Sequence, residues 1–173
     1  MPAEPKSARA NFARTTIARI AKTLSFLMIA LFLANLPRAQ ATTSDGVVLV
    51  KSGYAMDETI RRIKDDIAGK KIMFFDQIDQ AKLAAGAGIT LRPSTLLIFG
   101  NPPLGTQFLT SNPVSGLDWP VRILVFQDKD GTVWAAYTDF AWIAHRHGID
   151  DRAAQFKMAT MVVESITSTI KAQ

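Results

Sequence analysis

The sequence predicts an α+β fold: a two-layer sandwich with a β-α-β-β-β-β-α core, an antiparallel-dominated sheet and short inserted helices. Three observations lead to this prediction. Five short apolar runs have the length and composition of strands. Residues 56–68 and 152–171 repeat apolar side chains at helical spacing. Asp130-Gly131 is a hairpin turn signal between the last two strands. Strands interrupted by such helices favour one sheet covered by a helical layer.

The first half of the predicted domain alternates strands with helices. Residues 47–51 open with an apolar run and are expected to form the first strand. Residues 56–68 follow as an amphipathic helix, and Gly69 is expected to end it. Residues 71–78 then form the second strand, and residues 80–86 form a short alanine-rich helix.

The second half begins with the third strand, residues 95–99, which is apolar and bounded by turn formers, so we expect it to be central and buried. Residues 104–110 are expected to form one or two helical turns. Residues 120–127 and 132–138 form the hairpin, and residues 139–146 form a short helix before the long final one.

The first 41 residues have the pattern of a secretory signal peptide. They contain six Lys or Arg and one acidic residue, an apolar run over 24–34, and Ala39-Gln40-Ala41, so we predict cleavage after Ala41. The apolar run is shorter than the roughly 20 residues that a membrane-spanning helix needs. We therefore expect a single domain, residues 42–173, in the periplasm or secreted, with no stable membrane anchor after cleavage.

The charge and cysteine content exclude several classes of function. The formal net charge of +5 belongs to the N-terminal segment, because residues 42–173 contain 14 basic and 14 acidic side chains. A neutral domain lacks the basic surface of a nucleic-acid binder, so no nucleic-acid partner is expected. The chain has no cysteine, which excludes disulfides and thiolate metal sites. We predict no cofactor.

The segment Gly100-Asn101-Pro102-Pro103 ends the third strand. Glycine and asparagine tolerate positive φ, and each proline fixes its own φ and restricts the residue before it. Four such residues in a row specify one rigid loop, and rigid loops on a scaffold often carry binding function.

The stretch from Leu91 to Thr106 resembles the domain of unknown function 302 family, most specifically at Phe99-Gly100-Asn101-Pro102. The resemblance covers roughly residues 45–150 and includes Arg146-His147-Gly148. It implies a small α/β fold with no established activity. In one departure, this chain has Asp79-Gln80 where many members have Asp-His, so an activity that uses that histidine would be missing here.

We predict a ligand-binding pocket framed by the rigid loop and by residues distant in sequence: Arg92, Phe99, Gly100, Asn101, Pro102, Tyr137, Arg146 and His147. Arg92 and Arg146 together suit a small anionic ligand, because guanidinium groups offer paired donors. A structural interpretation stays open for the same residues: each arginine pairs with a nearby aspartate, and His147 satisfies a buried hydrogen bond.

Three functions remain open, and we favour a non-catalytic small-ligand-binding or assembly domain. The alternative is a small hydrolase or isomerase with His147 as acid/base and Arg146 as anion clamp, which requires a carboxylate within hydrogen-bond reach of His147 and an open cleft. A metal or haem binder would need His145 or His147 to converge with other ligands, and we assign no metal ligand.

The final helix also suggests a homodimer. Its stripe at three- and four-residue spacing is supplemented by Met158, Met161, Val162 and Val163, which make it apolar on more than one side. A helix with a wide apolar face needs two surfaces to cover it, and a second copy of the chain would supply one.

Overall fold

The computed structural model describes residue 43 and residues 45–172. The predicted signal peptide and its cleavage after Ala41 lie outside these residues and stay predictions. Within the described part of the chain, no helix is both long and apolar enough to cross a membrane.

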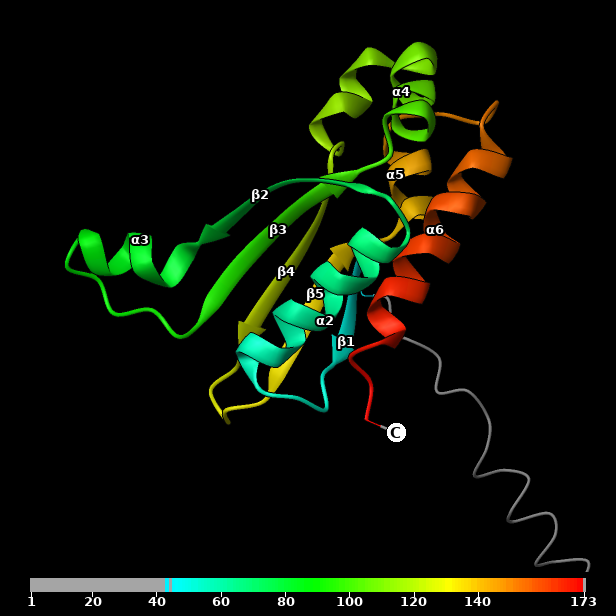
Figure 1. Ribbon diagram of the computed structural model, residues 1–173. Helices are drawn as coiled ribbons and strands as arrows, with labels where there is room; N and C mark the ends of the chain where they lie inside the picture. The colour runs from blue at the N-terminus through cyan, green and yellow to red at the C-terminus, as the bar shows by residue number, and fades with distance from the viewer. Residues whose placement is uncertain (1–42, 44, 173) are drawn as a thin grey trace, which may run out of the picture. The chain divides into compact units, whose positions relative to one another are not determined.

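One five-stranded sheet forms the scaffold (Figure 1). Its strands lie in the order β1-β5-β4-β3-β2, and every neighbouring pair is antiparallel. The strands are β1 (Val47–Lys51), β2 (Met73–Asp79), β3 (Ser94–Gly100), β4 (Val121–Gln127) and β5 (Val133–Thr138). The predicted antiparallel-dominated sheet is confirmed, with β3 beside its centre and β1 and β2 at its edges.

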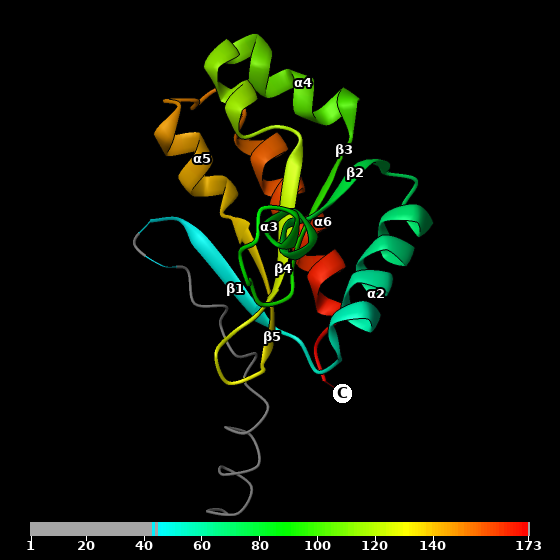
Figure 2. The same cartoon turned by 90° about the vertical axis from the view of Figure 1, so that its left-hand side faces the viewer.

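The helices supply the second layer. They are α2 (Met56–Gly69), α3 (Gln80–Gly86), α4 (Pro102–Ser111), η1 (Pro113–Leu117), α5 (Phe140–Arg146) and α6 (Ala153–Ser168). Helices α2 and α6 contact each other beside the sheet, and α5 also packs on α6 (Figures 1 and 2). The two-layer α+β fold is therefore confirmed, with α3, α4 and α5 as the short inserted helices.

The strand register separates the two faces of the sheet. Every strand residue in the hydrophobic core points to the helical side: Val48, Val50, Leu97, Phe99, Ile123, Val125, Val133, Ala135 and Tyr137. Because side chains alternate along a strand, the residues between them lie on the opposite side, which we call the open face. No residue of that face belongs to the core.

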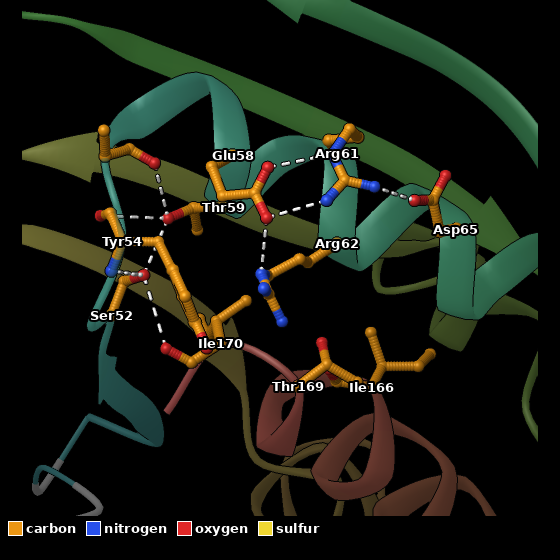
Figure 3. A network of polar contacts seen from close by, with 11 residues as sticks. Ser52, Tyr54, Glu58, Thr59, Arg61, Arg62, Asp65, Ile166, Thr169 and Ile170 are labelled. Atoms are coloured by element: carbon orange, nitrogen blue, oxygen red, sulfur yellow. Dashed lines mark hydrogen bonds and ion pairs between the residues drawn. The ribbon is translucent and has the colours of Figure 1, made fainter. Parts of the chain in front are cut away.

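A buried polar contact ties both ends of the domain to α2 (Figure 3). The hydroxyl oxygens of Ser52, just after β1, and Thr59, in α2, are 2.6 Å apart and both side chains are buried. Thr59 also donates to the carbonyl of Ala55 at 2.9 Å. The amide of Gly53 donates to the carbonyl of Ile170 after α6, at 2.8 Å. These bonds satisfy polar groups that would otherwise be costly to bury.

Helix α4 spans residues 102–111 where 104–110 was expected, and α6 spans 153–168 where 152–171 was expected. Two further local features differ from the sequence expectation. Helix α2 ends at Gly69 as predicted, but the left-handed residue that turns the chain is Lys71, with φ of 55°. Strand β2 therefore begins at Met73 rather than at residue 71, because a left-handed residue cannot continue an extended strand. The helical turns of η1 were not predicted; Asn112 begins them by accepting from the amide of Val114.

Candidate functional site

The rigid loop leads directly from β3 into α4. Phe99 is buried on the helical side of the sheet, Gly100 ends the strand, and Asn101 precedes the first helical residue. Pro102 and Pro103 occupy the first turn of α4, where a missing amide proton costs nothing. The amides of Leu104 and the next residue donate back to the carbonyl of Asn101. The start of α4 is thus closed by its own chain and offers no free amides to an anion.

Two glycines of this segment make room for the indole of Trp119. A Cβ on Gly105 would lie 1.7 Å from Nε1 of Trp119, and a Cβ on Gly100 would lie 3.3 Å from the same ring. Trp119 also meets the edge of Phe75 with ring centroids 6.1 Å apart. The glycines at both ends of the Gly100–Gly105 stretch are therefore required for close approach of an aromatic wall.

An apolar pocket of about 310 Å³ lies behind this wall. Phe99, Gly100 and Asn101 line it from β3, and the stacked rings of Phe108 and Phe156, 4.2 Å apart, join α4 to α6 beside it. Most of the remaining lining is apolar: Ile72, Leu104, Gly105, Phe108, Trp119, Val121, Phe140, Met158, Ala159, Val162 and Val163. Clefts of this size and lining are the usual form of small-molecule sites.

Few polar groups belong to the pocket. Two of the lining residues have polar side chains, Lys70 with an ammonium group and Asn101 with a carboxamide. The side chain of Lys70 is 31% exposed and forms an ion pair with Asp66 one helical turn earlier. Neither the side chain of Asn101 nor the indole N–H of Trp119 makes a hydrogen bond within the described chain. Asn101 and Trp119 therefore have hydrogen-bonding capacity to offer a ligand.

A second group of functional side chains, the Asp118 cluster, consists of Asp118, Arg122, Arg146 and His147. Nε2 of His147 lies 2.6 Å from one carboxylate oxygen of Asp118. Nη1 of Arg146 donates to both oxygens, at 3.1 and 3.3 Å, and Nη2 of Arg122 lies 3.6 Å from the carboxylate. One carboxylate after η1 thus holds two charged groups and an imidazole.

The Asp118 cluster is closed to solvent at its centre. The side chains of His147 and Asp118 are 5% and 7% exposed. The cavity beside Asp118, about 20 Å³, is large enough for roughly one water molecule. Asn112 reinforces the closure, because its amide group donates to the main-chain carbonyl of His147 at 2.8 Å. The cluster fastens the end of α5 to the segment after η1, and Asn112 adds a bond from the α4–η1 connection.

The remaining predicted site residues lie elsewhere. Arg92 precedes β3, at the opposite end of the strand from Gly100, which for seven residues is a separation of roughly 20 Å. Tyr137 is buried on β5 beneath α6. Burial, with smaller contributions from the charges of Glu164 and Asp139, raises the pKa of Tyr137 to about 12, against a side-chain hydrogen bond with Thr167 that lowers it.

The structure thus divides the eight predicted residues among four places. Phe99, Gly100 and Asn101 line the pocket, and Pro102 starts the helix at its edge. Arg146 and His147 belong to the Asp118 cluster, while Arg92 and Tyr137 are separate from both. Within the described residues, no three His, Asp or Glu side chains converge on a point suitable for a metal ion. Gln80, at the departure from the family pattern, accepts a hydrogen bond from Ser94.

Sequence reasoning missed most of the pocket. Leu104, Phe108, Trp119 and the α6 residues are apolar, and apolar residues in a sequence do not distinguish a pocket wall from a core. Spacing was the available signal: Gly100 and Gly105 recur five residues apart around two prolines, which suggests that something large packs against both. Asp118 gave no signal, because its partners are distant in sequence.

Comparison with known proteins agrees with the fold. A family model described as "Domain of unknown function DUF302" matches residues 48–169. A crystal structure of an uncharacterized conserved DUF302 protein from Bacillus stearothermophilus superposes with a TM-score of 0.66. It covers 73% of this chain and 98% of that one at 16% sequence identity, so the likeness concerns the fold alone.

Two named proteins share a stretch of sequence with this chain. Both are called fluoride-specific ion channel FluC 1, one from Brucella suis biovar 1 (strain 1330) and one from Brucella abortus biovar 1 (strain 9-941). Each is 35% identical over 113 residues, which is 65% of this chain. The same stretch is 44% and 42% of the respective channels, so this chain spans less than half the length of the curated relatives it matches.

Proposed function

The chain belongs to the family of the domain of unknown function DUF302, and we propose that it is a non-catalytic domain that binds a small, mostly apolar ligand in the pocket at the end of β3. The observation that carries this proposal is the pocket itself, about 310 Å³ and lined mainly by aromatic and aliphatic side chains. At the ~30 Å³ that a water molecule occupies in the liquid, this volume suits a ligand of roughly ten non-hydrogen atoms.

The ligand we propose has one polar or anionic end. Lys70 supplies the positive charge in the lining, and Asn101 supplies a carboxamide. Because Asp66 already pairs with Lys70, the ammonium contributes modest selectivity for an anion rather than most of the affinity. Burial of the apolar part supplies the larger share. A medium-chain carboxylate such as octanoate has the required size and polarity.

A non-catalytic role is favoured over hydrolysis or isomerisation because of how His147 is held. The carboxylate that an acid/base histidine requires is present at 2.6 Å, but the imidazole is 5% exposed, and the cavity beside Asp118 has a volume of only about 20 Å³. Arg146 is engaged by the same carboxylate, so it is a poor clamp for a substrate anion. His147 has the carboxylate partner that a catalytic base needs, but its buried imidazole is poorly accessible to a substrate, and this argues against a catalytic role.

The proposed location is the periplasm, on the strength of the signal-peptide pattern in residues 1–41. Channel activity is not carried over from the two Brucella proteins, because more than half of each lies outside the similar stretch. Their similarity means that a related stretch of sequence occurs in proteins named as channels.

The first test is calorimetric titration with octanoate and with octanol. We expect octanoate to bind with a Kd on the order of 0.1–1 mM, from about 0.5 kcal/mol for each of roughly ten atoms. Val162→Phe, which fills the pocket from α6, should weaken binding at least ten-fold, about 1.4 kcal/mol. Met161→Phe, on the exposed side of the same helix, is the matched control and should bind normally. Failure of both probes to bind the wild-type protein would contradict the proposal.

The second test isolates the polar end of the ligand. Lys70→Met should weaken octanoate binding about three-fold, the size expected for a partly exposed ion pair, and leave octanol unchanged. Lys71→Met is the control, because Lys71 follows Lys70 in the chain but does not line the pocket. An equal loss of affinity for octanoate and octanol would mean that Lys70 acts by packing. The proposal that the ligand has an anionic end would then be withdrawn.

A further inference from the structure

The open face of the sheet is unusual because its central row is apolar. An antiparallel sheet with one face in water normally alternates apolar residues inside with polar residues outside. Here one row across all five strands reads Leu49, Ala136, Leu124, Leu96 and Ile78, by direct register. Ile98, Phe126 and Trp134 extend the row above and below it. Charged side chains border this apolar centre: Asp76 and Arg122 lie beside Ile98, and Lys51 lies beside Trp134.

These side chains are half-buried by their neighbours on the sheet but lie outside the hydrophobic core. Within the described residues, α2 and α6 pack on the opposite face, where their core residues meet those of the strands. Helix α3 contacts β3, and its Gln80 accepts a hydrogen bond from Ser94 of the open face. A contiguous apolar surface of this kind marks an interface rather than a solvated face.

The same chain carries a second uncovered apolar element next to this face. Helix α3 and the loop after it, residues 80–93, form a projection that extends beyond the ends of β2 and β3, which we call the arm (Figure 1). No residue of α3 is buried. Leu83, Ile89 and Leu91 are 65%, 61% and 47% exposed, which is a high apolar exposure for fourteen residues.

The base of the arm and the open face together form a groove. The groove has a volume of about 520 Å³ and is lined by residues 90–94, which include Arg92, and by Leu124 and Phe126 of the open face with Gln127 at the end of β4. The groove therefore adjoins the apolar row of the sheet. Exposed apolar side chains such as Leu83 and Ile89, supplied by another arm, could pack there against Leu124 and Phe126.

We propose that a second copy of the chain covers the open face, in a two-fold homodimer whose sheets oppose each other and whose arms reach reciprocally into the partner's groove. A two-fold interface requires each copy to carry both halves of the contact. Among the residues that the structure describes, the open face and the arm lie side by side and neither belongs to the hydrophobic core. The proposal thus places the predicted homodimer on the open face and not on α6.

The available area suits a stable dimer. Five strands about 4.8 Å apart, each contributing about five residues, present a face of roughly 24 by 17 Å, on the order of 400 Å². The three exposed arm side chains add on the order of 300 Å². Each copy would then bury about 700 Å², close to the ~800 Å² per partner of stable protein interfaces.

Sedimentation velocity of the protein expressed from its full coding chain tests the proposal. We expect the wild-type protein to sediment as a dimer at micromolar concentration. Leu124→Glu, at the centre of the apolar row, should raise the dimer dissociation constant at least ten-fold. Met161→Glu, on the exposed side of α6, is the matched control and should leave the dimer intact. Circular dichroism establishes that each variant is folded.

The arm provides an independent variant if Leu124→Glu does not fold. The double substitution L83E/I89E changes only exposed side chains, so it should preserve the fold and still weaken the dimer at least ten-fold. A wild-type protein that is monomeric at these concentrations would overturn the proposal. A dimer that dissociates with Met161→Glu but not with Leu124→Glu or with the arm variant would also overturn it, in favour of an α6 interface.

Discussion

The pocket at the end of β3 and the Asp118 cluster consist of different kinds of side chain: the first is mostly apolar and the second is charged and polar. The pocket is apolar and open, and the carboxamide of Asn101 in its lining has no hydrogen-bond partner in the described chain. The Asp118 cluster contains the residues that most resemble catalytic groups, yet those residues are bonded to one another and its centre is closed.

The difference teaches that access decides function more than residue type does. A histidine beside a carboxylate is a familiar acid/base arrangement, but at 5% exposure the proposed role of His147 is to hold segments together. Aliphatic and aromatic side chains carry no chemistry of their own, but around an open volume they bind. Three experiments test whether the pocket binds the ligand while the Asp118 cluster stabilises the fold.

Gly105→Ala should have the largest effect and acts on the pocket. The new Cβ would lie 1.7 Å from Nε1 of Trp119, so the indole must move. We expect a loss of about 3 kcal/mol in the free energy of unfolding, because overpacking outweighs the better helix propensity of alanine. Octanoate binding should be lost, and tryptophan fluorescence should shift.

Gly86→Ala is the matched control, since it also lies in a helix but has no atom within 4 Å of the added Cβ. It should be neutral or stabilising by up to about 1 kcal/mol. Unaltered fluorescence and binding in Gly105→Ala would mean that Trp119 does not form the pocket wall.

His147→Ala should have an intermediate effect and acts on the Asp118 cluster. Removing a buried ring that is bonded to a carboxylate should cost about 2 kcal/mol in the free energy of unfolding, measured by urea denaturation. Octanoate affinity should stay within two-fold of wild type. His145→Ala, two residues earlier and exposed, should change stability by less than about 0.5 kcal/mol.

The opposite result for His147→Ala would contradict the distinction between the pocket and the Asp118 cluster. If the variant keeps its stability but loses octanoate binding, the Asp118 cluster belongs to the binding site and the two regions act as one.

The sequence predicted the elements of this fold well, because their signals are local. Residues 80–86 were predicted as a helix with the observed bounds, and so was the strand at 47–51. The Asp-Gly turn is stabilised by Asp128, whose pKa is lowered chiefly by a hydrogen bond from the indole of Trp134. Turn chemistry and apolar periodicity act over a few residues, which is why they can be read without a structure.

The candidate site was less predictable because its contacts are long-range. The rigid loop at Gly100 was recognised from its own residues, but the partner that it seats, Trp119, comes from beyond α4 and η1. Arg92 and Arg146 were expected to act together, although the register places Arg92 at the far end of β3. The apolar open face escaped notice for a related reason: Leu96 and Leu97 look alike in a sequence, and only strand pairing assigns them to opposite sides.

The third experiment concerns Tyr137, which lies in neither region, and its effect should be the smallest near neutral pH. Burial raises the pKa of Tyr137 from 10.0 to about 12. Between these values the unfolded chain loses the phenolic proton while the folded protein keeps it, so the folded state binds more protons. Stability from this group is therefore complete below pH 10 and falls as the pH rises toward 12, by roughly 2 kcal/mol.

Urea denaturation at several alkaline pH values measures that decline, and Tyr137→Phe should flatten it by the same amount. Because Tyr137 does not line the pocket, saturating octanoate should raise stability equally at each pH and leave the slope unchanged. A slope that changes with octanoate would couple Tyr137 to the ligand. The pocket would then extend under α6 toward β5. Tyr137 would be part of the binding site, as the sequence analysis predicted.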